Sequence, residues 1–474
     1  MTALFILVPL IGLIFMNQLF KDTTRQKMIW MGMLILAWQM VQVIIGVGNP
    51  GNAFARMPVV KYLSDILTVD FLSSVALFTI ALIALVALFV EKYAGQGDHF
   101  NFTNLVMLIV IGMNGVVMVD DLFSLYVFLE IVAVSSFVLI AIDRRRDALE
   151  GAFKYFVLSA IATLLILSAL ALLFMESKSL VFYDVKAYLV VSKSAYPITF
   201  IVAFMLFFTG LAIKSGLVPF HGWVPDAYTS ASSSVSVLLA GIVTKVAGVY
   251  IVMRMVRDVF VNILSIQHLL MGLGILSIFI GALAAIGQTD FKRMLAYSSI
   301  SQVGYIILGA AVGTNLGFIG AILHFFNHAT FKSLLFVNST AVESQTGTRD
   351  LNKLGGLASK MRITGGSSAI AFLSTAGIPP LSGFWSKLMI VLALWMAQYR
   401  EMAILAILGS VITLAYFLVL QRKVFFGKLA EGLENVREAN LGITIPSLVL
   451  SGIIILVGVL FPLIWAYLKS KALL

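Results

Sequence analysis

Residues 207–228 read FFTGLAIKSGLVPFHGWVPDAY, a hydrophobic run with a lysine, Lys214, in its interior and a proline-rich interruption directly after it. Apolar runs recur along the whole chain, and many reach the roughly 20 residues that a helix needs to cross a bilayer. Composition agrees, because 61% of the 474 residues are hydrophobic and only 11% are charged. A soluble domain carries roughly 25% charged residues. The sequence therefore predicts an all-α, polytopic membrane protein.

Five ionisable residues stand inside these apolar runs. They are Lys214, Lys245 in LLAGIVTKVAGVYIV, Lys332 in HFFNHATFKSLLFV, Lys387 in LSGFWSKLMIVLAL and Glu130 in FSLYVFLEIVAVSSF. Each such group costs roughly 2.5–3.5 kcal/mol at the bilayer centre, so five cost on the order of 12–17 kcal/mol. That sum matches the whole stability of an ordinary domain, about 5–15 kcal/mol. Charges retained at this cost mark an ion or proton pathway.

Composition also excludes several classes of function. The formal net charge is +10, but the basic residues are spread over many short loops and form no dense patch for nucleic acid. The chain has no cysteine. Thiolate-ligated iron–sulfur clusters, c-type haem and disulfides are thereby excluded from this chain. Any redox chemistry coupled to it is expected in another subunit.

Fourteen membrane spans are expected from the length and polarity of the apolar runs. They lie near residues 3–20, 28–47, 70–91, 102–119, 121–142, 153–175, 198–220, 229–254, 264–287, 294–313, 317–339, 364–386, 387–423 and 441–468. The thirteenth is too long for one helix, so part of it is assigned to a broken twelfth. Loops after odd-numbered spans carry 18 Lys and Arg residues and the opposite side carries 10. This bias predicts that both termini face outward from a cell membrane.

Two of the spans look broken. The seventh is interrupted after Lys214 by Gly216 and two prolines, and the twelfth is interrupted before Lys387 by the sequence GIPPLSG at 377–383. Proline frees backbone groups, which is tolerated at membrane depth only where protein or a water-filled cavity satisfies them. Interrupted segments in corresponding halves indicate a repeat-based transporter core. Because the two spans are five apart, such a repeat must be inverted. The alternative is a pair of ordinary proline kinks.

His324, His328 and Lys332 follow one another at intervals of four residues on the eleventh span, so they share one helix face. Histidine exchanges protons near neutral pH, which suits a relay. Either histidine alone would fit a satisfied core position. Axial haem ligation requires ligands on opposite sides of the ring, which neighbours on one helix cannot supply. A metal site is an even less supported interpretation, because no Asp, Glu or Cys accompanies the histidines.

Three further residues are candidates for proton uptake or release. Asp121 stands at a span edge, where simple solvation is an equal alternative. His221 and Asp226 flank the break after the seventh span and could line its inner mouth or cap the following helix. Ser298, Ser299 and Ser301 on the tenth span could hold water or bond back to their own helix.

Six stretches together resemble the antiporter-like proton-translocating subunits. The stretches are DLFSLYVFLEI, KSGLVPFHGWVPDAY, GIVTKVAGVY, FKRMLAYSSISQVGYI, HFFNHATFKSLLF and GIPPLSGFWSKL, and they span roughly residues 100–425. Subunits of this kind occur in respiratory complex I (M- and N-types), in Mrp-type cation/proton antiporters (D-type) and in membrane-bound hydrogenases. One departure is that the family often has an A-P-x-P pattern after PDAY, where this chain reads TSASSSVS.

The resemblance implies both a fold and residue roles. The fold has fourteen helices with two inverted five-helix repeats. The expected divisions are 1–100, a first repeat at 101–258, a second repeat at 259–425, and 426–474. Glu130 corresponds to the family's glutamate that pairs with the seventh-helix lysine, here Lys214, and Lys245 to its bridging lysine. His324, His328 and Lys332 correspond to the relay, and Lys387 to the release residue.

Three classes of function remain open at this stage. The favoured one is a proton- or sodium-translocating subunit of a redox-driven complex. No cofactor is expected in this chain, and iron–sulfur or nickel–iron centres are expected in its partners. Those partners are further antiporter-like and small helical subunits together with a peripheral redox arm. The second class is a D-type component of an Mrp-type antiporter, without redox partners. The third class is an inert scaffold. The free-energy cost of placing the charged residues in the bilayer argues against it.

Overall fold

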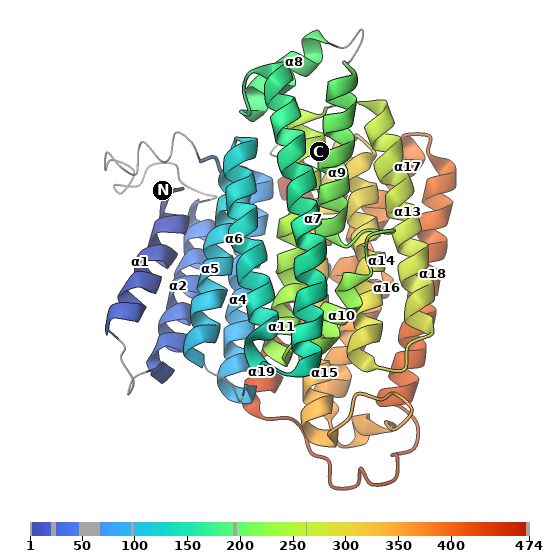
Figure 1. Cartoon of the computed structure of the whole chain (residues 1–474). Helices are drawn as coiled ribbons and strands as arrows, with labels where there is room; N and C mark the ends of the chain where they lie inside the picture. The colour runs from blue at the N-terminus through green and yellow to red at the C-terminus, as the bar shows by residue number, and fades with distance from the viewer. Residues whose placement is uncertain are drawn as a thin grey trace. The chain divides into compact units, whose positions relative to one another are not determined.

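The computed structural model describes residues 2–19, 25–46, 67–95, 99–192, 197–261 and 263–470 (Figure 1). The chain ends and most of the loop expected at 48–69 lie outside these residues. Within them the backbone is helical or irregular, with three isolated bridges and no strand. Eleven of the described helices are long and apolar enough to cross a membrane, and two shorter apolar helices accompany them. The predicted all-α polytopic fold is confirmed.

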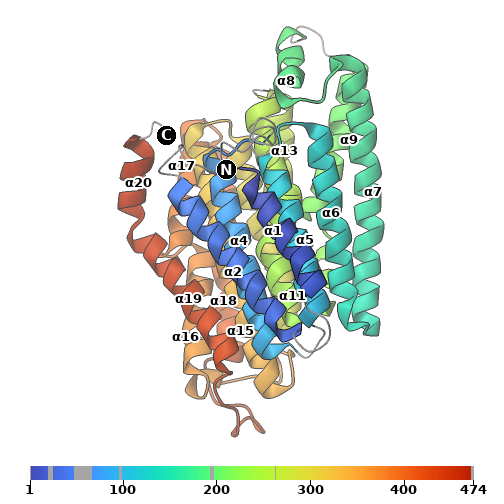
Figure 2. The same ribbon diagram turned by 90° about the vertical axis from the view of Figure 1, so that its left-hand side faces the viewer.

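The chain divides into two compact units. Unit 1 comprises residues 1–92, 96–215 and 242–261. Its elements are α1 (Leu4–Leu19), α2 (Arg25–Gly46), α4 (Phe71–Ala94), α5 (His99–Met118), α6 (Leu122–Ile140), η2 (Ala141–Asp143), α7 (Arg146–Ser177), α8 (Phe182–Val191), α9 (Ile198–Ser215), η4 (Lys245–Tyr250), α12 (Ile251–Arg254) and η5 (Met255–Val259). Long α7 packs along α9, and α5 packs along α6 (Figure 1). Figure 2 shows α1 and α2 side by side. The short helix α8 lies where only a loop was expected.

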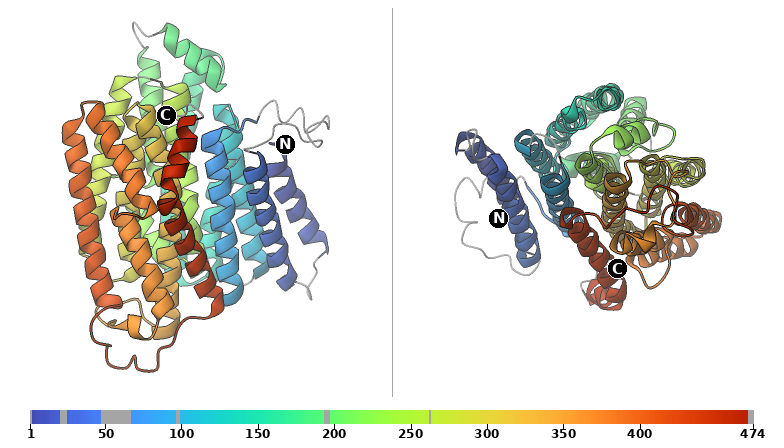
Figure 3. Two further views of the ribbon diagram at one scale, coloured as in Figure 1. Left: turned by 180° about the vertical axis from the view of Figure 1, so that it is seen from behind. Right: turned by 90° about the horizontal axis from the view of Figure 1, so that it is seen from below.

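Unit 2 comprises residues 93–95, 216–241 and 262–474. Its elements are α10 (Trp223–Ser230), α11 (Ser233–Leu238), α13 (Leu264–Ile286), α14 (Phe291–Ala311), α15 (Asn315–Thr346), η6 (Leu357–Ser359), α16 (Arg362–Ala376), α17 (Ser382–Met396), α18 (Arg400–Val424), α19 (Leu441–Val459) and α20 (Phe461–Ser470). Helix α15 packs against α14, α17 and α19. Seen from behind, the last helices, orange to red, stand beside one another (Figure 3). The compact units do not follow the expected repeats, so the repeat division stays a prediction.

Both expected breaks are present. Helix α9 ends at Ser215, Gly216 takes a positive φ of 66°, and the helix resumes only at Trp223. Helix α16 ends at Ala376, Gly377 takes a φ of 86°, and α17 begins at Ser382. Glycine suits these positions because it adopts the left-handed conformation without steric cost. Each break also contains a cis peptide bond, at Val218–Pro219 and Pro379–Pro380.

The long thirteenth run divides as expected, because α17 ends at Met396 and α18 begins at Arg400. The last span also divides, into α19 and α20, directly before Pro462. Proline is tolerated in the first turn of a helix but not in its interior, which explains the new start.

The eighth span extends to Val259, five residues beyond the expected end at 254. It contains three stretches of wide π-helical turns, η3 (Leu239–Val243), η4 and η5. Such turns are rare in helices and occur frequently at functional sites. Lys245 begins the middle stretch.

Candidate ion-translocation site

Unit 1 contains an ion pair between the buried Lys214 and the half-buried Glu130. The Nζ atom of Lys214 lies 3.0 Å from Oε1 of Glu130, and the two side chains are 2% and 28% exposed. Lys214 comes from the last turn of α9 and Glu130 from the middle of α6. The structure therefore brings together two residues that the sequence analysis paired only by resemblance.

Helix α7 completes the environment of this pair with two hydroxyl groups. Lys214 Nζ lies 3.2 Å from Ser159 Oγ and 3.3 Å from Thr163 Oγ1, and Thr163 also donates to Glu130 Oε1 at 2.6 Å. A buried charge is tolerated only when it is paired and its remaining hydrogen-bonding groups are satisfied. Three contacts match the three donors of the ammonium. Neither hydroxyl was predicted from the sequence, and the two lie one helical turn apart on α7.

Lys245 lies in the same unit and is fully buried. Its Nζ atom lies 3.3 Å from Thr244 Oγ1. The wide turns around it pack against α9 at Gly248, where a Cβ atom would lie 2.5 Å from Ser215 N. Only glycine permits so close an approach. Gly248 thus allows the helix that carries Lys245 to contact the chain directly after Lys214.

Unit 2 holds the second group of candidates, on α15. His324, His328 and Lys332 are all fully buried. Lys332 contacts Ser298 of α14, lies 3.4 Å from the carbonyl oxygen of Leu295, and faces the ring of Phe417 at 5.5 Å. Ser298 is therefore a partner of Lys332, although its hydroxyl also bonds back to Leu295, as the alternative interpretation expected.

The tautomer of His324 follows from the hydrogen bonds of Ser386. The Ser386 hydroxyl donates to Gly383 O at 3.1 Å and accepts from Asn327 Nδ2 at 3.1 Å. Its contact with His324 Nδ1, at 2.9 Å, is then one in which the histidine donates. The Nε2 atom of His324 has no hydrogen-bond partner among the described residues. Its lone pair is therefore available to receive a proton.

Lys387, in the second turn of α17, is surrounded differently from Lys214. Its Nζ atom lies 3.3 Å from Ser410 Oγ and 4.3 Å from the centre of the Tyr305 ring, and it forms no ion pair with a described residue. The Tyr305 ring also lies 5.7 Å from that of His324. Tyr305 thus bridges the α15 histidine and the α17 lysine. It lies within the motif at 291–306, but its role was not anticipated.

Beyond Lys332 a second polar group continues along α15. Asn338 accepts hydrogen bonds from Ser447 at 2.7 Å and from Ser367 at 3.2 Å, and Gln421 donates to Ser368 at 2.8 Å. The Nδ2 atom of Asn338 and the Oε1 atom of Gln421 are buried without a hydrogen-bond partner among the described residues. Buried polar atoms of this kind are commonly satisfied by ordered water.

The three uptake or release candidates have clear structural surroundings. Asp121 caps α6, accepting from Ser124 N at 2.7 Å. Asp226 pairs with Arg293 at 2.7 Å, and the cap position of α10 is taken by Gly222, so neither Asp226 nor His221 caps that helix. The His221 ring lies 6.5 Å from that of Tyr297, and burial lowers the pKa of His221.

Unit 1 also contains an ion-pair network that was not predicted from the sequence. Arg254 binds Asp70 through two hydrogen bonds of 2.7 and 2.9 Å, and its Nη1 atom lies 2.8 Å from Asp258. Burial alone would raise the pKa of Asp70, but the hydrogen bonds and charge of Arg254 lower it to about 2. The only sign of this network in the sequence was that Asp70 and Arg254 each stand at the end of a span. Among the described residues, no three His, Asp or Glu side chains gather as a metal site.

A family profile described as "NADH:quinone oxidoreductase/Mrp antiporter, TM" matches residues 119–413. The chain belongs to this family. The matched segment contains all seven candidate relay residues, namely Glu130, Lys214, Lys245, His324, His328, Lys332 and Lys387. The chain is 29% identical to the D-type subunit of the Na(+)/H(+) antiporter of Alkalihalophilus pseudofirmus, over 95% of this chain and 92% of that protein. It is 35% identical to "NADH-quinone oxidoreductase subunit N" of Desulforudis audaxviator, over 71% and 69%.

Solved structures show the same relationship. A chain of the archaeal membrane-bound sulfane sulfur reductase is similar with a TM-score of 0.83 and 26% identity, over 96% of this chain and 76% of that chain. A chain of respiratory complex I from Thermus thermophilus gives 0.79 and 26%, over 98% of both. A chain of the Mrp complex from a Dietzia species gives 0.86 at 23% identity, over 98% and 95%, which bears on the fold alone. This family member is thus an antiporter-like membrane subunit of the kind found in Mrp, complex I and related membrane complexes.

Proposed function

We propose that this chain translocates protons, or sodium ions, through the membrane as a subunit of a redox-driven complex. The observation that carries the proposal is the Lys214–Glu130 pair, in which a 2% exposed ammonium stands at a helix break within a membrane span. The carboxylate stabilises the charged lysine. When the pair opens, the buried ammonium loses that stabilisation and releases its proton.

In the proposed sequence, the proton leaves Lys214 for Lys245, continues to Lys332, His328 and His324, and reaches Lys387. His324 receives it at Nε2. Among the described residues, the Lys387 ammonium has a tyrosine ring and a serine hydroxyl beside it but no carboxylate within ion-pair distance, whereas Lys214 is paired with Glu130. That difference suits it to release. We further propose that His221, Asp226 and Asp121 lie along the uptake or release routes.

The event that opens the pair is proposed to come from a neighbouring subunit. The chain itself leaves 28% of the Glu130 side chain uncovered, so a partner can contact this side chain. The proposed partners are further antiporter-like and small helical subunits and a peripheral redox arm, whose iron–sulfur or nickel–iron centres would supply the driving reaction. The chain is proposed to lie in the cytoplasmic membrane with both termini on the outer face.

A second candidate function is that of the D-type subunit in an Mrp-type cation/proton antiporter, driven by an existing gradient. The observation that favours it is coverage. The similarity to the D-type antiporter protein spans 95% of this chain, against 71% for the N-type protein of the NADH-quinone oxidoreductase.

One experiment separates the two candidates. The full chain is tagged and extracted in mild detergent, and the co-purifying proteins and metals are identified. Stoichiometric iron–sulfur or nickel–iron subunits would establish the redox-driven complex. Membrane partners without any metal would instead establish the antiporter. In either complex, Lys214→Ala should abolish ion translocation while the subunit composition stays unchanged. Full translocation by that variant would contradict both candidates.

A further inference from the structure

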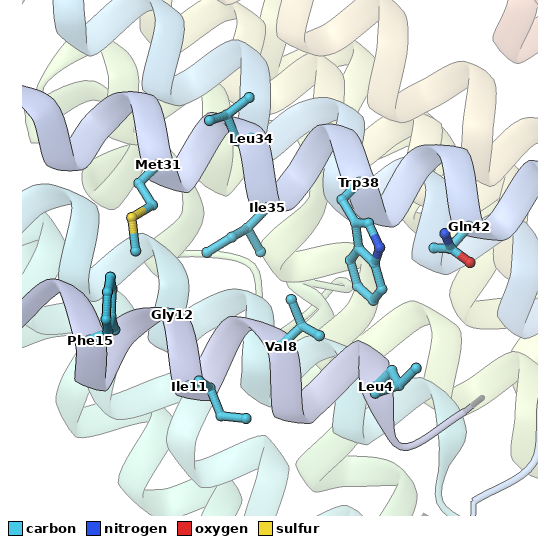
Figure 4. Close-up of a pocket in the computed structure, with 10 residues that line it drawn as sticks. All are labelled: Leu4, Val8, Ile11, Gly12, Phe15, Met31, Leu34, Ile35, Trp38 and Gln42. Atoms are coloured by element: carbon cyan, nitrogen blue, oxygen red, sulfur yellow. The ribbon is translucent and has the colours of Figure 1, made fainter. Parts of the chain in front are cut away.

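Two pockets in unit 1 differ in their polar character. The groove between α1 and α2, of about 550 Å³, is lined by apolar side chains and one glycine, with Gln42 as the exception (Figure 4). It shows no feature that would select an occupant. The second pocket, of about 680 Å³, lies between α5, the end of α6 and the first turns of α7. It has an apolar part and a polar part, which together suggest an amphipathic ligand.

The apolar part is formed by aromatic and aliphatic side chains. Phe137 and Phe156 contact each other edge to face with ring centres 5.2 Å apart. Phe153, 64% exposed, stands on the same helix as Phe156. Phe137, Phe153 and Phe156 all line the pocket, so it has an apolar wall suited to a lipid chain.

The polar part contains Arg144 and two asparagines, Asn101 and Asn104. Asn104 is held in place because it exchanges hydrogen bonds of 3.0 and 3.2 Å with Asn17 of α1. Arg144 forms no ion pair with a described residue. Amide and guanidinium groups of this kind bind phosphate oxygens, and a guanidinium does so through two parallel hydrogen bonds.

The nearby acidic residues are engaged elsewhere. Asp143 and Asp147 lie 3.9 and 4.0 Å from Arg145, and Glu150 lies 2.8 Å from Lys154. Arg146, next in the chain, likewise forms no ion pair with a described residue. Among the described residues, the positive charge of Arg144 in the pocket lining therefore has no carboxylate within ion-pair distance, which favours an anionic ligand.

The backbone at Arg144 takes a conformation that glycine would adopt more readily. Arg144 adopts a left-handed conformation, with φ 53° and ψ 16°, where its N–H donates to Ala141 O at 3.0 Å. Glycine takes this conformation readily, whereas an L side chain does so at a steric cost. Glycine at position 144 would therefore remove the guanidinium and this steric cost together.

We propose that this pocket binds an anionic glycerophospholipid. Arg144, with the amides of Asn101 and Asn104, holds the phosphate, and one acyl chain lies along Phe137, Phe153 and Phe156. The site belongs to the end of unit 1 that the distribution of Lys and Arg assigns to the inner face. It does not depend on which ion the chain moves or on what drives it.

The full chain, purified in a neutral detergent, is tested with dioleoyl phosphatidylglycerol and dioleoyl phosphatidylcholine, which have the same acyl chains. The melting temperature should rise more with the anionic lipid. Arg144→Gly should abolish this difference while leaving the melting temperature without lipid unchanged or higher, because glycine relieves the backbone. One basic residue at an anionic surface is worth about 1 kcal/mol, which corresponds to about fivefold weaker binding when it is removed.

The matched control is Lys178→Gly. Lys178 is also a basic residue in a left-handed cap, with φ 58°, but it lies at the opposite end of α7. This variant should retain the full preference for the anionic lipid. A preference that survives Arg144→Gly, or that Lys178→Gly removes equally, would overturn the proposal.

A photo-crosslinking residue at position 153 tests the native complex. Cross-links to phosphatidylglycerol in intact membranes are expected. Cross-links to a neighbouring subunit in place of lipid would show that the pocket is a protein interface and would overturn the proposal.

Discussion

The Nζ atom of Lys214 lies 3.0 Å from Oε1 of Glu130, although the two residues are 84 positions apart in the chain. Helix α7 joins them through Thr163, which contacts both. Side chains of three helices, α6, α7 and α9, therefore meet at this ion pair. Replacing either member alone leaves the other charge without its counterion in a low-dielectric environment.

Glu130→Gln should preserve the shape of the pair but remove its charge. We expect ion translocation to fall on the order of tenfold or more, because a loss of 1.4 kcal/mol already corresponds to a factor of ten. Dye quenching in inverted vesicles measures the rate. Glu150→Gln, an exposed residue at the start of α7, is the control and should translocate normally. Equal rates in the wild type and Glu130→Gln would contradict the proposed role.

Gly248→Ala should separate α9 from the wide turns that carry Lys245. The added Cβ would lie 2.5 Å from Ser215 N and 2.6 Å from Ser215 Cα, so backbone must move. Overpacking of this kind costs about 1–3 kcal/mol. We expect a lower melting temperature and slower translocation. In Gly272→Ala the new methyl group meets nothing within 4 Å, and that variant should be neutral or slightly more stable.

Tyr305→Leu should impair translocation more than Tyr305→Phe. The ring of Tyr305 faces both Lys387 and His324, and its hydroxyl donates to Ala406 O at 2.7 Å. Phenylalanine keeps the cation–π contact, worth about 0.5–2 kcal/mol, whereas leucine loses it. Translocation assays on the two variants at matched expression decide the question. If the two variants were equally impaired, the hydroxyl, which both lack, and not the ring would be the functional group.

Asp70→Asn should destabilise the protein at neutral pH by about 1–2 kcal/mol, a range reduced because the Asp70 side chain is 38% exposed. The pKa of Asp70 in the folded protein is about 2, below the value of about 3.9 of the unfolded chain. Its stabilisation is therefore present above about pH 4 and is lost as the pH falls from about 4 to about 2.

Thermal unfolding across that pH window measures the effect. The difference between the wild type and Asp70→Asn should shrink as the pH falls. Asp147→Asn, whose side chain is 56% exposed, should show little difference at any pH. A difference between wild type and Asp70→Asn that persisted unchanged at pH 2 would contradict the assigned pKa.

The sequence predicted features that depend on local chemistry. Gly216 and Gly377 mark real helix breaks because glycine and proline act on their own backbone. The shared face of His324 and Lys332 follows from helical periodicity. In contrast, Thr163 could not be assigned to Lys214, because a lipid-embedded helix is apolar on all sides and its pattern does not reveal which face meets which neighbour. The wide turns around Lys245 also left no recognisable signal.

The pairing of Asp70 with Arg254 was hidden for the same reason. The two residues are 184 positions apart, and each stands at a span end, where a solvated charge is the ordinary expectation. Only the packing of α4 beside the eighth span selects them as partners. Long-range electrostatic contacts in this chain therefore required the three-dimensional structure, whereas helix positions and breaks did not.

The partly uncovered Glu130 has a consequence for electrical insulation. A glutamate side chain that is 28% exposed cannot face hydrocarbon without attracting water or lipid headgroups. Beside a lone copy of the chain, the hydrocarbon layer would thus be thinner next to the Lys214–Glu130 pair. Assembly with a neighbouring subunit would restore that layer. Subunit association in this protein would then act as a seal against leakage as well as a mechanical coupling.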